Sequence, residues 1–478
     1  MMISKLSIEE ARKGLTSRSF SCRELIESCL SVIEEKDAEI HAFLSVCSED
    51  ALKQADLVDA KIARGETIGM LEGIPYSVKD VILVEDMKAT AGSRILEEFV
   101  APYDATVIKR LKEAGAIVIG KTNCDAYGFG SSTENSDFGV TKNPHDLTRV
   151  AGGSSGGSAA SVAAGMCIFS LGEDTGGSIR QPSAFCGITG LKVGYGRVSR
   201  YGSIAYASSF DSIGPMARSA RDVAIVLSVI AGVDEHDHTT VSDDVPDYIA
   251  HVETEEKKAM RIGVPAEYLE GLDPAIRSVF DRALNKFRRM GHEVIDISLP
   301  HTKYAIACYY LLATSEASSN LSRLDGVRFG YRDKDAKTME ELYKSSRSYG
   351  FGPEVKRRIM LGTFALSAGH FDAYYKKAQK VRTLIRKDFD DAFKAIDVIV
   401  TPTAPSTAFK VGEKTDDPVE MYLADVYTVG FSLAGLPTVS VPCGLVDDLP
   451  VGMQISGPLL HESRVLHAAH VFESHKQS

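Results

Sequence analysis

Two short turns rich in glycine and serine carry the residues of this chain that could do chemistry. The first is residues 152–158 (GGSSGGS) and the second is residues 174–182 (DTGGSIRQP). Glycine allows the backbone to approach a ligand closely, and consecutive N–H groups can hold a developing oxyanion. Because both turns also carry serine hydroxyls, together they predict a cleft for nucleophilic attack on a carbonyl group.

Lys79 is the candidate base for such an attack. It lies in residues 76–80 (YSVKD), which lead into the apolar stretch 81–83. A serine is a weak nucleophile until a base takes its proton. Burial disfavours the charged form of a lysine, and the neutral amine can act as that base. From the residues alone, a plain surface lysine stays the alternative.

Three other interpretations of the glycine-rich stretches are weaker. A flexible linker conflicts with the ordered-looking flanks of residues 152–158. Gly153-x-Ser155-x-Gly157 spells the nucleophile elbow of α/β-hydrolases, which needs a strand directly before it, whereas residues 143–149 read as a polar loop. Residues 115–122 (GAIVIGKT) spell a phosphate loop, but a predicted strand lies inside the motif and a helix precedes it.

Metal and disulfide chemistry are not predicted. His236, Asp237 and His238 could bind a metal, but they lie in an acidic stretch with no obvious third ligand, and a solvated surface is the simpler interpretation. The eight cysteines include no pair separated by two residues. We therefore expect reduced, mostly buried thiols.

The elements that must position the two turns follow from hydrophobic periodicity. Residues 1–65 are predicted to be helical, with a capping box of Ser7 and Glu10 at the first helix. From Gly73 onward, short β-branched runs alternate with helices. The clearest units are a helix at 106–114, a strand at 116–119, a helix at 159–164 and a strand at 168–171. This alternation predicts an α/β fold with a mixed central β-sheet flanked by helices.

The second half of the chain continues the pattern after a composition shift. Residues 234–256 are acidic and polar and predict an exposed connection, and residues 303–395 predict a mostly helical region rich in Arg, Lys and Tyr. The remaining predicted elements are strands at 261–265, 293–295, 397–400, 439–442 and 452–455, and a helix at 275–290.

Composition fits a globular protein of 478 residues, with 44% hydrophobic and 25% charged residues. The net charge of −11 argues against broad binding of a phosphate backbone by this chain alone. No apolar signal core and no apolar run long enough for a bilayer is visible. We therefore expect a cytoplasmic protein with no membrane partner.

At this point the chain resembles a known family. The two turns, through Ser178-Ile179-Arg180-x-Pro182, are similar to the glycine/serine signature of the amidase signature family. Later segments resemble one branch of that family, the glutamine-hydrolysing subunits of tRNA-dependent amidotransferases. These segments are residues 130–136, 195–202, 316–321, 325–328, 356–362 and 421–425. The resemblance implies the amidase-signature fold, with an N-terminal helical segment (1–65) and a signature domain (66–478) that contains a helical insertion at about 303–395.

The resemblance also implies the roles of individual residues. Lys79 would be the base, Ser154 a bridging serine held by a cis peptide, and Ser178 the nucleophile. The N–H groups of Thr175, Gly176 and Gly177 would form the oxyanion hole, and Tyr309 would line the pocket. Arg358 would bind the α-carboxylate of glutamine, and Asp425 would bind its ammonium group. Arg358 lies in a basic helix, where a solvent-facing arginine is the alternative.

The implied function is a glutaminase that supplies ammonia for converting misacylated Glu-tRNA(Gln) or Asp-tRNA(Asn) to Gln-tRNA(Gln) or Asn-tRNA(Asn). The implied partners are subunits B and C of a heterotrimer, with the tRNA, ATP and Mg²⁺ handled mainly by a partner and no cofactor in this chain. A stand-alone amidase acting on small amides and a non-catalytic scaffold are the alternatives. The sequence departs from the usual family pattern at residues 124–129, His145, Ala151 and Glu173.

Overall fold

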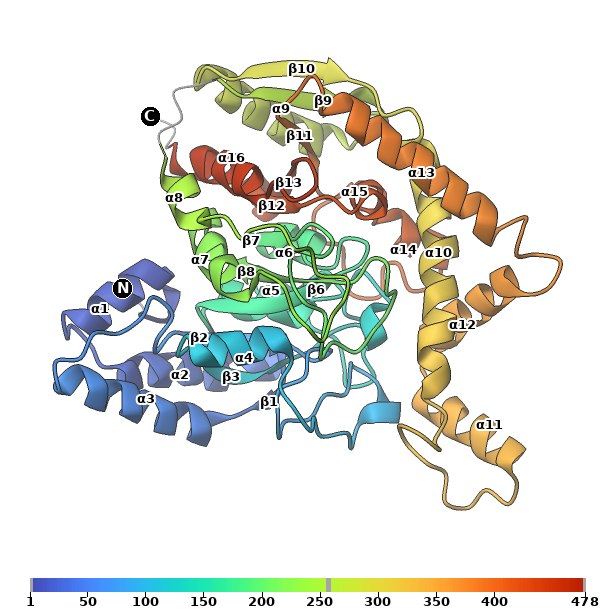
Figure 1. The fold of residues 1–478 in the computed structure, drawn as a ribbon, viewed down its shortest axis with the longest axis horizontal. Helices are drawn as coiled ribbons and strands as arrows, with labels where there is room; N and C mark the ends of the chain where they lie inside the picture. The colour runs from blue at the N-terminus through green and yellow to red at the C-terminus, as the bar shows by residue number, and fades with distance from the viewer. Residues whose placement is uncertain (1–2, 255–258, 476–478) are drawn as a thin grey trace.

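The centre of the molecule is a mixed β-sheet. A computed structural model describes residues 3–254 and 259–475. Within them, eleven strands form one sheet in the order β1-β3-β2-β6-β8-β7-β12-β13-β11-β9-β10 (Figure 1). The strands are β1 (Phe43–Val46), β2 (Pro75–Lys79), β3 (Ile117–Thr122), β6 (Phe169–Asp174), β7 (Thr189–Lys192), β8 (Ser212–Ala217), β9 (Arg261–Pro265), β10 (Glu293–Ile297), β11 (Val398–Pro402), β12 (Thr438–Val446) and β13 (Leu449–Ser456).

Parallel pairing in one part of the sheet brings the predicted base to the glycine-rich turns. β2 runs parallel to both β3 and β6, with Tyr76 opposite Phe169 and Val78 opposite Leu171. Parallel neighbours end at the same edge of a sheet, where α/β proteins place their ligands. Lys79 at the end of β2 therefore lies beside the end of β6, where the second turn begins. The α/β prediction with a mixed sheet is confirmed.

Helices cover the sheet on both sides and form one flank of the molecule (Figure 1). Their starts follow local signals, since Ser7 and Ser21 each close a capping box with a glutamate three residues later. The helices are α1 (Ile8–Thr16), α2 (Cys22–Ile40), α3 (Ser48–Ala63), α4 (Thr106–Glu113), α5 (Gly156–Ala164), α6 (Arg180–Cys186), α7 (Ala220–Ile230), α8 (Tyr248–Glu253), α9 (Pro274–Arg289), α10 (Ala305–Asn320), α11 (Met339–Gly350), α12 (Pro353–Leu366), α13 (Tyr375–Ala392), α14 (Pro418–Leu423), α15 (Val429–Ala434) and α16 (Glu462–Ser474).

Three short segments differ from the sequence prediction. The stretch 1–65 is not only helical, because β1 pairs antiparallel with β3 at the sheet edge. Residues 143–149 are not an open loop, because β4 (Lys142–Asn143) and β5 (Asp146–Val150) form a separate two-stranded sheet. These strands have only two to five residues, too few for a periodic pattern to emerge.

The acidic connection also holds more structure than predicted. Within residues 234–256, α8 begins at the cap Asp247 and buries Tyr248 and Val252. Two buried side chains in a six-residue helix give too weak a pattern for sequence reasoning. Residues 255–256 of the predicted connection lie outside the described part of the chain.

The helical region predicted at 303–395 is confirmed as α10 to α13. The long helix α10 runs along one flank of the molecule, and α11 and α12 lie beside its outer part (Figure 1). α10 packs against α12, α13 and α15, which connects this flank to the C-terminal half of the sheet. Across the described residues, no helix combines the length and apolar character needed to cross a bilayer. All eight cysteines are free thiols, and six are buried.

Candidate active site

Lys79 is buried at the end of β2 and faces the first glycine-rich turn. Its side chain is fully shielded from solvent, and Nζ donates a hydrogen bond to Ser154 Oγ at 2.8 Å. The alternative of a surface lysine is therefore wrong. The peptide bond between Gly153 and Ser154 is cis, as the resemblance implied.

A loop that follows β3 braces this first turn. The Asp125 carboxylate accepts backbone N–H groups of Thr133 at 2.9 Å and Asn135 at 3.0 Å. The Thr133 hydroxyl then donates to Gly152 O at 2.8 Å and accepts the Gly156 N–H at 3.1 Å. The turn is thus held by buried polar contacts on both of its sides, which explains why this Gly/Ser run is ordered rather than a linker.

Ser178 lies on the second turn, next to the first. The Ser155 N–H donates to Ser178 O at 3.1 Å, which fixes the two turns side by side. Ser178 is 6% exposed, and among the described residues its hydroxyl has no hydrogen-bond partner. The Ser155 hydroxyl, by contrast, donates inward to Glu173 O at 3.0 Å. Ser178 is therefore the hydroxyl available to a ligand, and Ser155 does not fit the elbow interpretation.

Glycine is required at both positions before Ser178. A Cβ on Gly176 would lie 2.6 Å from Tyr309, and a Cβ on Gly177 would lie 2.5 Å from the Thr428 hydroxyl oxygen. Gly177 also has φ +144°, in the region that side chains rarely adopt. The close approach places Tyr309 directly against this turn, as expected for a residue that lines the pocket.

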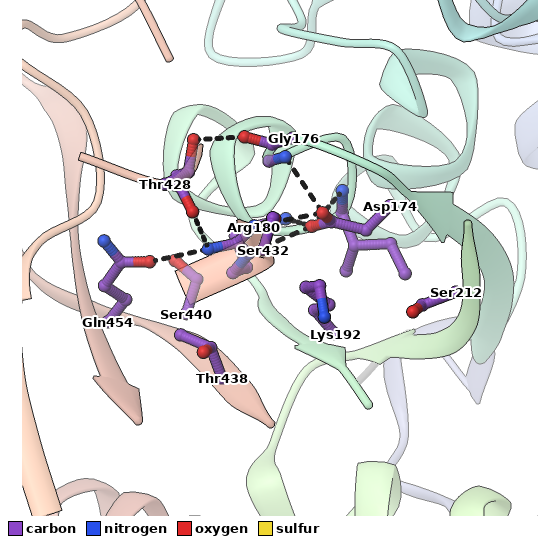
Figure 2. A network of polar contacts seen from close by, with 12 residues as sticks. Asp174, Gly176, Arg180, Lys192, Ser212, Thr428, Ser432, Thr438, Ser440 and Gln454 are labelled. Atoms are coloured by element: carbon purple, nitrogen blue, oxygen red, sulfur yellow. Dashed lines mark hydrogen bonds and ion pairs between the residues drawn. The ribbon is translucent and has the colours of Figure 1, made fainter. Parts of the chain in front are cut away.

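Behind the second turn lies a buried polar network centred on Asp174 and Arg180 (Figure 2). The Arg180 guanidinium pairs with both carboxylate oxygens of Asp174 at 3.0 Å, through Nε and Nη2. Its remaining donors reach Thr428 O at 2.9 Å, Gln454 Oε1 at 3.2 Å and Ser432 Oγ at 2.9 Å. Burial works against ionisation of Asp174, but Arg180 outweighs it and holds the pKa below its usual value.

The same network determines which N–H groups face outward. The Gly177 N–H donates to Asp174 Oδ1 at 2.9 Å, and the Ile179 N–H donates to Oδ2 at 3.1 Å. The Gly176 carbonyl accepts the Thr428 hydroxyl proton. Of the three N–H groups predicted for the oxyanion hole, that of Gly177 is engaged inside the protein in this structure.

Arg358 is buried, so the solvent-facing alternative does not hold. The side chain is 3% exposed, and Nε pairs with Glu354 Oε1 at 2.7 Å while Nη1 donates to Tyr206 Oη at 2.9 Å. The guanidinium also lies 5.2 Å from the ring centroids of Tyr310 and Tyr422. Aromatic faces and one carboxylate stabilise this buried cation, and among the described residues its Nη2 has no hydrogen-bond partner and could take an anion.

Asp425 lies on the other side of Tyr310. Its carboxylate accepts the Tyr310 hydroxyl at 2.8 Å and the Ser131 hydroxyl at 2.7 Å. Burial raises the pKa of Asp425 to about 6. Tyr310 therefore contacts a buried cation and a buried carboxylate at once, which is the arrangement expected around the two charged groups of an amino acid.

Sequence reasoning missed several residues of this shell. Tyr206, Tyr310, Glu354 and Ser131 all contact Arg358 or Asp425 but were not singled out. Two of them could have been suspected from the sequence, because Ser131 lies in one of the segments that carry the family resemblance and Tyr310 directly follows Tyr309. A lone tyrosine such as Tyr206 gives none.

The rejected motifs have structural roles. Lys121, from the phosphate-loop spelling, is a buried residue of β3 that pairs with Asp80 at 3.1 Å. In the histidine cluster, Asp237 accepts the Arg200 N–H at 2.9 Å and His236 stacks on Tyr201. Within residues 3–254 and 259–475, no three His, Cys, Asp or Glu side chains gather in a way that would hold a metal ion.

Comparison with known proteins agrees with this geometry. The Amidase family matches residues 24–466. The A subunit of glutamyl-tRNA(Gln) amidotransferase from Koribacter versatilis is 53% identical over 475 residues, which cover 99% of both chains. The protein of the same name from Geobacillus thermodenitrificans is 53% identical over 476 residues, with 98% of each chain covered. The crystal structure of the Thermotoga maritima protein of that name aligns with a TM-score of 0.80 and 42% identity, over 97% of this chain and 93% of that one. The resemblance seen in the two turns is confirmed, and the chain belongs to the Amidase family.

Proposed function

We propose that this chain is the glutamine-hydrolysing subunit of a tRNA-dependent amidotransferase. The observation that carries the proposal is the buried contact between Lys79 and Ser154, on the turn beside the one that carries the Ser178 hydroxyl. Full-length similarity to proteins named as the A subunit of glutamyl-tRNA(Gln) amidotransferase supports the choice of glutamine as substrate. A buried lysine linked to serine hydroxyls provides a base for a nucleophile that is weak on its own.

In the proposed reaction, Ser178 Oγ attacks the side-chain amide carbon of glutamine. The Ser178 proton passes to Ser154, and the Ser154 proton passes to the neutral amine of Lys79. The N–H groups of Thr175 and Gly176 hold the oxyanion, joined by that of Gly177 if it turns from Asp174. The carbon–nitrogen bond then breaks, and the proton returns through Ser154 to the leaving ammonia. Water attacks the acyl-enzyme, which releases glutamate and restores the Ser178 hydroxyl.

Arg358, Asp425 and Tyr309 would orient the amino acid for this attack. The free donor of Arg358 suits a carboxylate, and Asp425 suits an ammonium. Tyr310 contacts both residues, so the two charges of glutamine would be held a short distance apart. Tyr309 against Gly176 would direct the amide toward Ser178.

The ammonia would serve the conversion of misacylated Glu-tRNA(Gln), or Asp-tRNA(Asn), to the correctly amidated tRNA. We place this chain in the cytoplasm, in a heterotrimer with subunits B and C. The tRNA, ATP and Mg²⁺ would be bound mainly by a partner, and this chain would need no cofactor for glutamine hydrolysis. The chain would consist of an N-terminal segment, 1–65, and a signature domain, 66–478, that contains the helical insertion at about 303–395.

A transamidation assay with two nitrogen sources tests the proposal. The chain is co-purified with its partner subunits and supplied with misacylated tRNA, ATP and Mg²⁺. We expect Ser178→Ala to lose the glutamine-dependent reaction while retaining the reaction with ammonium chloride. Retained glutamine use would overturn the role of Ser178. Equal hydrolysis of small amides by the isolated chain, with no effect of partners, would favour a stand-alone amidase instead.

A further inference from the structure

A second buried side chain contacts the proposed base. Lys79 Nζ donates to three acceptors: Ser154 Oγ at 2.8 Å, Glu173 Oε2 at 3.0 Å and the Glu173 carbonyl oxygen at 3.1 Å. The Glu173 side chain is 4% exposed and comes from β6, the neighbour of the strand that ends at Lys79. Two of the three acceptors around the base thus belong to one residue.

These contacts set the orientation of the amine. A neutral amine has two N–H groups and one lone pair. When both N–H groups donate to the two Glu173 oxygens, the lone pair points at the Ser154 hydroxyl. Without the Glu173 side chain, one N–H group would lose its acceptor and the amine could rotate. The carboxylate also lies where it would offset the positive charge that the amine gains with the serine proton.

The carboxylate fits its site closely and has few other partners. Its Oε1 accepts the Thr175 hydroxyl at 3.3 Å. Gly128 lies against both groups, because a Cβ there would be in ordinary van der Waals contact with Glu173 Oε2 at 3.5 Å and with Ser154 Oγ at 3.4 Å. The geometry therefore directs the carboxylate toward Lys79.

Other titratable groups lie around Glu173 and Lys79. Asp211 lies across from Glu173, and its pKa is raised first by burial and then by the Glu173 charge. The Arg200 charge lowers the pKa of Asp211, and the Glu316 charge raises it. On the Lys79 side, burial raises the pKa of the Cys124 thiol.

We propose that Glu173 is a positioning residue of the triad, which aims the Lys79 amine at Ser154 and stabilises it when it takes the proton. This inference rests on the proposed triad of Lys79, Ser154 and Ser178. It concerns the activation of Ser178 and not the identity of the amide.

The test is the rate at which a fluorophosphonate labels Ser178 in the intact complex, measured from pH 5 to pH 10. This probe reacts with an activated serine and has no ammonium group, so Asp425 does not affect the profile. In Glu173→Gln, an amide of the same size replaces the anion. We expect the pH of half-maximal labelling to fall by about 1 to 3 pH units, because an anion no longer favours the protonated amine. In Glu173→Ala, which also loses the acceptor, we expect the maximal rate to fall by about 10- to 100-fold.

Glu462→Gln is the matched control. Glu462 is a fully buried glutamate that pairs with Arg197 Nε at 3.4 Å and accepts the Gly194 N–H at 3.0 Å, so its partners are not residues of the triad. It should leave the labelling profile unchanged, even if thermal stability falls. An unshifted profile in Glu173→Gln with a normal melting temperature overturns the inference. A shifted profile in a complex that fails to hydrolyse glutamine would contradict the glutaminase proposal and leave this inference standing.

Discussion

Two neighbouring residues of β6, Glu173 and Asp174, form buried ion pairs with different cations, a lysine and an arginine. Successive side chains of a strand point to opposite faces, so the two carboxylates meet different cations. Asp174 binds Arg180 through two parallel contacts and also accepts backbone N–H groups of the second glycine-rich turn. Glu173 binds Lys79, whose third contact is the hydroxyl of Ser154.

The difference lies in what each cation can do with a proton. Arginine stays protonated at any pH that a folded protein meets, whereas a buried lysine can lose its proton. All contacts of the Arg180 pair are to groups that hold the turn in shape (Figure 2). Lys79, in contrast, also contacts the Ser154 hydroxyl, on the turn beside the proposed nucleophile. One pair therefore fixes the backbone, and the other is suited to move a proton.

The largest effect is predicted for a variant that breaks the ion pair between Lys79 and Glu173. Lys79→Met should lower glutamine hydrolysis by about 10⁴-fold or more, because the serine nucleophile loses its base. The measurement is the initial rate of glutamate release by the purified complex at saturating glutamine. A rate within tenfold of the native rate would contradict the role of Lys79.

Lys121→Met is the matched control for this variant. Lys121 is equally buried, lies on the adjacent strand β3 and pairs with Asp80. Its loss should lower stability but leave the rate for each folded molecule close to native. This comparison separates the loss of a buried cation from the loss of the base.

The next largest effect is predicted for a variant that breaks the ion pair between Arg180 and Asp174. Arg180→Met leaves Asp174 buried without its cation, and we expect a loss of about 3 to 5 kcal/mol in the free energy of unfolding. Urea unfolding followed by circular dichroism checks this. Arg261→Met removes an exposed ion pair with Asp397 and should cost less than about 1 kcal/mol. If the two variants lose similar stability, the network around Asp174 does not hold the turn as described.

A third carboxylate sharpens the comparison because, within the described part of the chain, its hydrogen bonds come from hydroxyl groups and not from a cation. Asp425 accepts from Ser131 and Tyr310, and burial raises its pKa to about 6. Below that pH it becomes neutral and would no longer attract an ammonium. In the Ser178→Ala complex, the Kd for glutamine should therefore be about tenfold higher at pH 5 than at pH 7.5.

Asp425→Asn tests the same point at constant pH. Calorimetric titration at pH 7.5 should show binding weakened by about 10- to 100-fold, with the dependence on pH removed. If Asp425→Asn still binds glutamine with the native dependence on pH, a group other than Asp425 causes that dependence.

The sequence pointed to Lys79, Ser154 and Ser178 more directly than to the residues around them. Ser154 and Ser178 lie in glycine-rich turns, and Lys79 lies in residues 76–80, directly before an apolar stretch. The contacts of Lys79 with Glu173 and of Arg358 with Tyr206 join residues 94 and 152 positions apart. Such contacts depend on strand pairing and helix packing, which local patterns do not encode. For the same reason, the short strands β1, β4 and β5 were missed while the longer α9 was predicted to within one residue at each end.

The smallest effect concerns Lys192, a second buried cation beside Asp174 (Figure 2). Burial lowers its pKa to about 7, although Asp174 opposes this, and its Nζ donates to the backbone carbonyls of Val193 and Leu436. In the unfolded chain a lysine stays charged up to about pH 10. Folding therefore releases a proton above pH 7, and stability should rise with pH. Between pH 7.5 and pH 8.5, the native protein should gain about 1 kcal/mol relative to Lys192→Met in urea unfolding. Lys53→Met, at an exposed lysine, should keep the native slope. Equal slopes in the native protein and Lys192→Met would mean that Lys192 stays charged, and that this part of the network, like Arg180, cannot release a proton.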